Sequence, residues 1–201
     1  MGSFFTNVQV RVDAREPEQS RRRIVAALRQ WMTASGYIEV HDEDNRERTF
    51  LVGPVTKHPW ITIYDSATEG QSDSVLSELT TVLSAAMRGV AIAVLMHDSD
   101  VLELTLFEQG ARQDEYRLEL GAIQNAPVSL TRWARLLVPG VTDMDLRAMW
   151  ATQVTFAEEW VQQLAVLVDW SQDHVLSGHN SVTLLYPFVL GCFRRRFAPA
   201  L

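Results

Sequence analysis

Two short segments carry the residue types best suited to metal chemistry. Residues 41–44 (HDED) and 97–100 (HDSD) each place a histidine close to two aspartates. Imidazole nitrogens and carboxylate oxygens bind divalent transition metals, and a bound ion can activate water for hydrolysis. This pattern predicts the site of a metal-dependent hydrolase. Its ligands would be His97, Asp98 and Asp100, together with His41, Asp42 and Asp44.

The same segments are more typical of plain turns than of metal sites. Each follows a predicted strand, and Asp and Ser favour tight turns because their side chains bond to nearby backbone amides. A second polar group, with the same ambiguity, consists of Asp169, Asp173, His174 and His179. Its two histidines are five positions apart, so they do not share a helical face as paired zinc ligands do. We expect a surface loop there.

Other catalytic signatures are absent from the sequence. It contains no Gly-x-Ser-x-Gly elbow, no Ser-x-x-Lys set and no glycine-rich phosphate loop. The single cysteine, Cys192, lies in an apolar stretch, where burial leaves a thiol unreactive. We therefore expect no cofactor, and the sequence favours a binding protein over an enzyme.

The charge balance is acidic, with 25 Asp and Glu against 18 Lys and Arg and a net charge of -7. This charge repels a phosphate backbone, so nucleic acid is excluded as a partner and a basic or neutral protein is favoured. Charge is concentrated in an acidic loop at 42–47 and an arginine triplet at 194–196. The residues expected to bind a partner protein are Asp42, Glu43, Asp44, Glu47, Arg194, Arg195 and Arg196.

No segment predicts insertion into a membrane. Residues 1–10 lack the basic start and apolar core of a signal peptide. The longest apolar stretches, 90–96 and 184–193, are too short to span a bilayer, and Pro187 interrupts the second. A lone cysteine cannot form an internal disulfide. We expect a cytoplasmic protein with no membrane partner.

Strand and helix patterns succeed one another through residue 120. Val8, Val10 and Val12 alternate with polar residues, as in a strand with one buried face. Apolar residues three and four positions apart predict one helix from Pro17 to near Ser35 and another over 74–88. The remaining predicted strands are 37–40, 49–55, 60–64, 90–96, 102–106 and 116–120.

This order predicts an α+β fold whose two βαβ-like halves resemble a duplicated ferredoxin-like antiparallel sheet. The strands at 37–40 and 49–55 flank a polar loop and predict a hairpin. The continuous apolar run at 90–96 predicts a central strand covered on both faces. We expect a sheet domain over residues 1–122 and a helical segment over 123–201 packed on or beside it.

Helical signals dominate after Pro127. Thr142 and Asp143 can cap one helix, and Thr155 and Glu158 have the spacing of a capping box before another. Of the tryptophans at 133, 150, 160 and 170, we expect two or three in the core and one at an interface. Residues 184–193 fit either a strand or a buried helix.

Residues 91–102 (AIAVLMHDSDVL) and 156–159 (FAEE) resemble segments of uncharacterised bacterial proteins. The resemblance attaches no activity. Of the 18 basic residues only Lys57 is lysine, a bias typical of a GC-rich, bacterial genome.

The leading hypothesis is a non-enzymatic binding protein, of immunity or adaptor type, that docks another protein. A homodimer is compatible with it. The first alternative is the metal-dependent hydrolase described above. The second is a small-ligand sensor with a pocket between sheet and helices.

Overall fold

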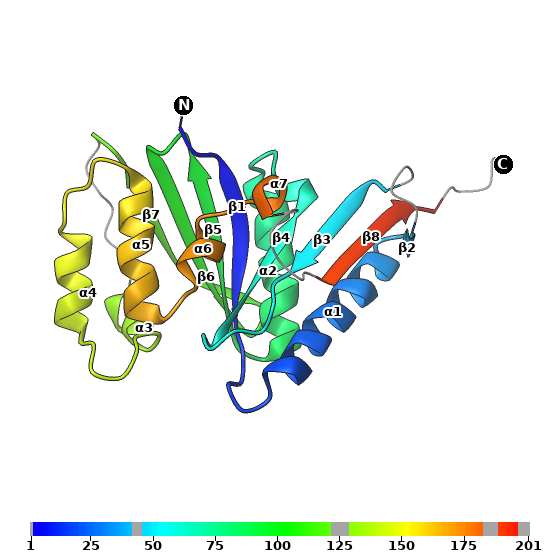
Figure 1. Ribbon diagram of the computed structural model, residues 1–201, viewed down its shortest axis with the longest axis horizontal. Coiled ribbons are helices and arrows are strands. Elements are labelled where there is room, and N and C mark those ends of the chain that lie inside the picture. Colours follow the sequence, from blue (N-terminus) through cyan, green and yellow to red (C-terminus); the bar gives the residue numbers. More distant parts are fainter. Residues whose placement is uncertain (1, 42–45, 122–128, 183–188, 197–201) are drawn as a thin grey trace.

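The computed structural model describes residues 2–41, 46–121, 129–182 and 189–196. Within these ranges the chain forms one open sheet in which every neighbouring pair is antiparallel, in the order β2-β8-β3-β4-β1-β5-β6-β7 (Figure 1). The fold is therefore mixed α+β, as the sequence predicts. The strands are β1 (Phe5–Arg11), β2 (Tyr37–Glu39), β3 (Arg48–Val52), β4 (Trp60–Asp65), β5 (Val90–His97), β6 (Val101–Glu108), β7 (Ala111–Glu119) and β8 (Val189–Arg195).

Helices cover both faces of the sheet (Figure 1). Two long helices pack on one face, and the helices that follow β7 pack on the other. The helices are α1 (Pro17–Ala34), α2 (Asp73–Met87), α3 (Leu130–Ala134), α4 (Asp143–Trp150), α5 (Ala157–Val168), α6 (Gln172–Val175) and α7 (His179–Val182), with a short 3₁₀ helix η2 (Ser66–Thr68).

Strand β5 confirms the prediction of a central strand covered on both faces. Ala91, Ala93 and Leu95 belong to the core beneath α1 and α2, whereas Ile92 and Val94 belong to the core beneath the later helices. Because successive side chains of a strand point to opposite faces, a continuous apolar run is what two covering layers require.

The later helices are held to the sheet mainly by aromatic side chains. All four tryptophans from 133 to 170 are buried, so the expectation that one would lie at an interface is wrong. Trp160 of α5 stacks on Tyr116 of β7 with ring centroids 4.6 Å apart, and Trp150 of α4 lies 6.2 Å from Trp160. These rings tie α4 and α5 to the sheet edge.

Strand β8 shows that the described part of the ambiguous segment 184–193 is a strand, and it overturns the predicted hairpin; residues 184–188 lie outside the described residues. Residues 189–195 are a strand that pairs with β2 on one side and with β3 on the other. The strands predicted to pair directly are thus separated by a strand from the far end of the chain. Pairing over such sequence separation leaves no local signal. The strand order does not confirm a duplicated ferredoxin-like sheet, which stays a prediction, as does the division near residue 122.

Helix ends follow the sequence in part. Pro17 begins α1, and Thr142 forms a capping box with Asp145 at the start of α4. The capping box predicted from Thr155 and Glu158 is wrong, because Phe156 is the N-cap of α5 and its side chain makes no capping bond. Glu158 instead accepts a hydrogen bond from the hydroxyl of Ser99 in the β5–β6 turn.

Candidate interaction surface

The HDSD segment forms the turn between β5 and β6. His97 pairs with Val101, and the amide of Asp100 donates to the carbonyl of His97 at 3.1 Å. Asp98 and Ser99 have φ values of 50° and 60°. A non-glycine residue in this left-handed region costs about 1–2 kcal/mol. The β6–β7 turn also has positive φ at two residues, Gln109 and Gly110. One of these is glycine, whereas both residues of the β5–β6 turn carry side chains.

Ser99 compensates for this cost by joining three segments of the chain. Its buried hydroxyl accepts from the amide of Ser3 at 2.7 Å and donates to Oε1 of Glu158 at 2.6 Å. Its amide donates to the carbonyl of Ser3, and its carbonyl accepts from the amide of Ala157 at 2.9 Å. The turn, the N-terminal segment and the start of α5 therefore form one hydrogen-bonded unit. They lie at the same end of the sheet (Figure 1).

The start of the chain fits closely against this turn. A Cβ atom added to Gly2 would lie 2.2 Å from Oδ1 and 2.4 Å from the carbonyl oxygen of Asp98. Both separations are shorter than any van der Waals contact, and the second involves backbone. Glycine is therefore required at position 2 for the chain to take this path.

Two large apolar side chains flank the turn and stay in solvent. Phe4 is 53% exposed and Phe156 is 54% exposed. The Phe4 and His97 rings pack in a T-shaped arrangement with centroids 4.9 Å apart, and His97 Nδ1 is hydrogen-bonded to Gln71 Oε1. Phe156 directly precedes the residue that bonds to Ser99. We call Phe4, His97, Asp98, Asp100 and Phe156 the turn surface.

Carboxylates lie in the turn surface and in the adjoining first turn of α5. Asp98, Asp100 and Glu159 are exposed. Glu158 is only partly exposed; burial raises its pKa, but hydrogen bonding by Ser3 and Ser99 outweighs burial and holds the pKa below its ordinary value. The carboxylate of Glu158 therefore stays charged beneath the surface, and the whole patch has negative character.

The two histidine-containing segments do not meet. His41 is exposed just after β2, and Asp42 and Asp44 lie outside the described residues. Strands β2 and β5 are five positions apart in the sheet, which is about 24 Å at the usual strand spacing. A shared ion between His41 and His97 is thus excluded. Within the described ranges no group of three His, Cys, Asp or Glu side chains is placed to hold a metal.

Glu47, at the end of the predicted acidic loop, lies next to the strand that carries the first two arginines of the triplet. The amide of Glu47 donates to the carbonyl of Phe193 at 2.8 Å, and Arg195 Nε donates to the Tyr37 hydroxyl at 3.1 Å. Tyr37 and, to a smaller extent, Glu47 raise the pKa of Arg195. Of the predicted partner-binding residues, Glu47, Arg195 and Arg196 are exposed and Arg194 is half-buried. Asp42, Glu43 and Asp44 are not among the described residues. The described members of this predicted partner-binding set thus contain both signs of charge.

The second polar group is divided between core and surface. His174 and His179 are buried, and burial lowers the pKa of each. His179 Nε2 lies 2.7 Å from Thr49 Oγ1, and the α7 backbone at His179 donates to Glu69. Asp169 pairs instead with His58 at 2.6 Å, at the edge of an open hollow of about 380 Å³. The prediction of a surface loop is wrong for the two histidines, which are buried and pack α6 and α7 against the rest of the protein.

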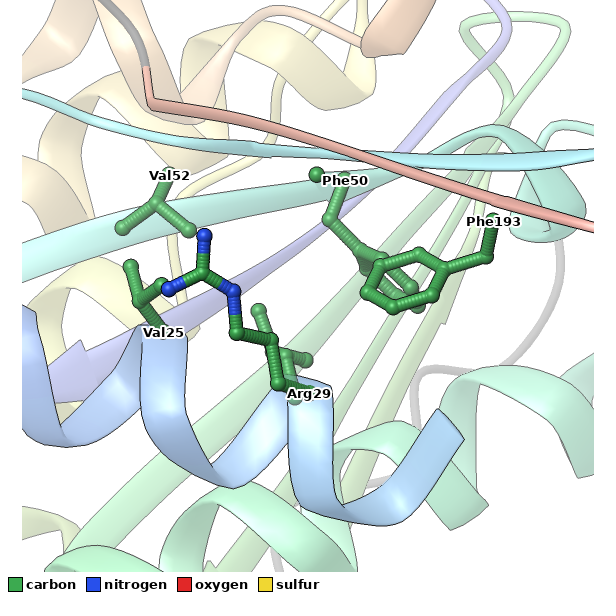
Figure 2. Close-up of a pocket in the computed structure, with 7 residues that line it drawn as sticks. Val25, Arg29, Phe50, Val52 and Phe193 are labelled. Carbon is green, nitrogen blue, oxygen red and sulfur yellow. The ribbon is translucent and has the colours of Figure 1, made fainter. Parts of the chain in front are cut away.

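An apolar crevice lies between α1 and the β3–β8 pair (Figure 2). Phe50 and Phe193 meet at 5.8 Å on one side, and Val25 and Val52 line the other. It encloses about 10 Å³, which is room for one water. Arg29 lies across it and pairs with Glu39 at 2.9 Å. This crevice is a packing seam and offers no ligand site.

No protein-family model, no curated protein and no solved structure matches this chain. Within the described part of the chain, no helix combines the length and the apolar character needed to cross a membrane.

Sequence reasoning identified the HDSD turn but missed Phe4 and Phe156, the residues that make it a surface. An apolar residue that directly precedes the first predicted strand and another at a helix N-cap position were the available signals. Neither shows its exposure until the turn brings their segments together.

Proposed function

We propose that the protein is a non-enzymatic binding protein that docks a partner protein through the turn surface. The observation that carries this proposal is a pair of half-exposed phenylalanines in two segments that are hydrogen-bonded to a turn whose two central residues, both non-glycine, have positive φ. Strain of this kind persists where the surroundings enforce it and is concentrated at functional sites. Aromatic anchors on a fixed frame are typical of the centres of protein interfaces.

The charge around the patch defines the partner. Asp98 and Asp100 are exposed in the turn and Glu159 is exposed in the first turn of α5, and the chain as a whole carries a net charge of -7. Complementary charge speeds encounter and selects partners. The occupant is therefore a protein that presents an apolar spot bordered by Lys or Arg. As the sequence led us to expect, we place this interaction in the bacterial cytoplasm.

Site-specific photocrosslinking in cells of the source organism tests the proposal. The photoreactive residue p-benzoylphenylalanine would replace Phe156 or Phe4 in the full chain, one at a time. Both positions should yield the same adduct, with one partner of basic surface. The matched control position is Met144 on α4, which is 74% exposed and lies outside the turn surface, and it should not yield this adduct.

Three outcomes would overturn the proposal. The first is the absence of an adduct from Phe4 and Phe156 at normal cellular levels. The second is an equal yield from Met144. The third is an adduct that contains only a second copy of this chain, which would replace the basic partner by a homodimer.

A further inference from the structure

A further concave site lies between the sheet and α3, at the end of the sheet opposite the turn surface. Its volume is about 240 Å³, and it lies between β1, β5 and β6 on one side and α3 with the following turn on the other. Three arginines line it: Arg11 at the end of β1, and Arg132 and Arg135 on and after α3. Three cations around one small hollow are unexpected in a chain with more acids than bases.

Two of these arginines are held in place by their neighbours. Arg11 lies over the Trp60 ring at 5.8 Å and donates to the Arg135 carbonyl at 3.2 Å. Arg132 donates to the carbonyl of Gln113 on β7. Neither contact neutralises a charge, because a carbonyl oxygen is uncharged. Within the described residues, none of the three arginines forms an ion pair with a carboxylate.

The fourth charged residue at this site does not cancel the other three. Glu108 lines the hollow at the end of β6, yet no nitrogen of the three arginines lies within ion-pair distance of it. The lining therefore has an excess of two positive charges. Planar guanidinium groups match a carboxylate with two parallel hydrogen bonds.

The remaining lining is apolar. Leu106 and Leu136 are buried and Val90 is half-buried. The volume is below the range of about 300–1,000 Å³ that is usual for drug-sized ligands. An occupant must then be small, with an apolar body on the leucines and an anionic head toward the arginines.

We propose that this hollow, the arginine pocket, binds a small organic carboxylate with an apolar ring or short acyl chain. This site is distinct from the turn surface, and its occupancy does not depend on the partner protein. It corresponds to the small-ligand pocket between sheet and helices that the sequence left open.

Methyl NMR of the full-length protein with benzoate as the probe tests the arginine pocket. Benzoate should shift the methyl signals of Val90, Leu106 and Leu136, with a Kd of about 1 mM or tighter. Benzamide, which has the same ring without the charge, and inorganic phosphate, which has charge without the ring, should each bind at least about tenfold more weakly. Added salt should weaken benzoate binding.

Arg135→Gln is the decisive variant, because Arg135 is exposed and its loss should not disturb folding. Its Kd for benzoate should rise about tenfold or more, which is about 1.4 kcal/mol. Arg22→Gln, at an exposed position on α1 across the sheet, is the matched control and should bind as the wild type does. Benzamide binding as tightly as benzoate, equal effects of the two substitutions, or the absence of shifts at these methyl groups would each overturn the proposal.

Discussion

Ser99 is the residue on which the turn surface depends. One hydroxyl and two backbone groups connect it to Ser3, Glu158 and Ala157, all of which are more than fifty positions away from it in the sequence. Its neighbour Asp98 shares the left-handed backbone but stays exposed. The two residues therefore have separable roles: Ser99 supports the turn, and Asp98 presents charge to a partner.

The substitution Asp98→Gly tests the strain at this turn. Glycine takes positive φ without a steric penalty, which removes a cost of about 1–2 kcal/mol. Glycine also loses more chain entropy on folding, which costs about 0.5–1 kcal/mol, so the free energy of unfolding should rise by about 0.5–1 kcal/mol. Binding of the partner should weaken, because a carboxylate is lost. Urea denaturation measures the first effect. A loss of stability would show that the contacts of the Asp98 side chain stabilise the fold by more than its positive φ destabilises it.

Replacing Ser99 by alanine should act in the opposite direction. Ser99→Ala removes the buried hydroxyl bond to Glu158 and leaves the Ser3 amide without its acceptor. The free energy of unfolding should fall by about 1–3 kcal/mol, the usual cost of unsatisfied buried groups. The exposed Ser74→Ala on α2 is the control and should change stability by less than about 0.5 kcal/mol.

At the scale of elements, α5 joins the aromatic core to the turn surface. Its first residues bond to Ser99, and Trp160, one turn further on, stacks on Tyr116. The same burial raises the pKa of the Tyr116 hydroxyl to about 12. Because both contacts come from one helix, the position of Phe156 is fixed by the core beneath it.

Trp160→Ala should therefore destabilise the whole sheet edge. Trp160 is fully buried, and the truncation of a buried aromatic to alanine costs about 3–5 kcal/mol. Val166→Ala on the exposed side of the same helix should cost less than about 0.5 kcal/mol. Thermal and urea unfolding of both variants provide the comparison. Similar losses for the two would mean that α5 is not anchored by its tryptophan.

The sequence predicts elements with clear local patterns and fails where pairing is distant. The alternation of Val8 and Val10 and the apolar run of β5 identify their strands correctly. The place of β8 between β2 and β3 has no local signature, because its partners lie more than a hundred residues away. At the site, the HDSD segment was visible, but the exposure of Phe4 and Phe156 depends on tertiary contacts.

In the molecule as a whole, two helical layers cover the two faces of the open sheet. The turn surface and the arginine pocket lie at opposite ends of β1. Buried polar groups attach the later helices: Asn7 Nδ2 donates to the carbonyls of Val175 and Ser177, and the Tyr64 hydroxyl donates to that of His174. These bonds fix the segment that contains the two buried histidines, so protonation of those histidines bears on the stability of the fold.

Stability should therefore decrease in mild acid. Burial lowers the pKa of His174 and His179 in the folded state, so the unfolded chain takes up protons first as the pH falls through about 6.5. The free energy of unfolding should decline from that pH until the folded pKa values are reached. Glu69 and Glu103, whose pKa values burial raises, act in the opposite direction closer to pH 4.5.

Urea denaturation between pH 7.5 and 5.5 measures this decline. The variant His174→Asn/His179→Asn should be less stable than the wild type at neutral pH but should lose less stability on acidification. An equal decline in both proteins would assign the pH dependence to other groups.

The central claim is that Phe4 and Phe156 anchor a partner on the turn surface. Its most direct test is the dissociation constant, measured by calorimetry, between the purified protein and the partner identified by crosslinking. Phe4→Ser and Phe156→Ser should each weaken binding by at least about tenfold, whereas Val166→Ser should leave it unchanged. Dissociation constants for both phenylalanine variants equal to that of the wild type would contradict the account.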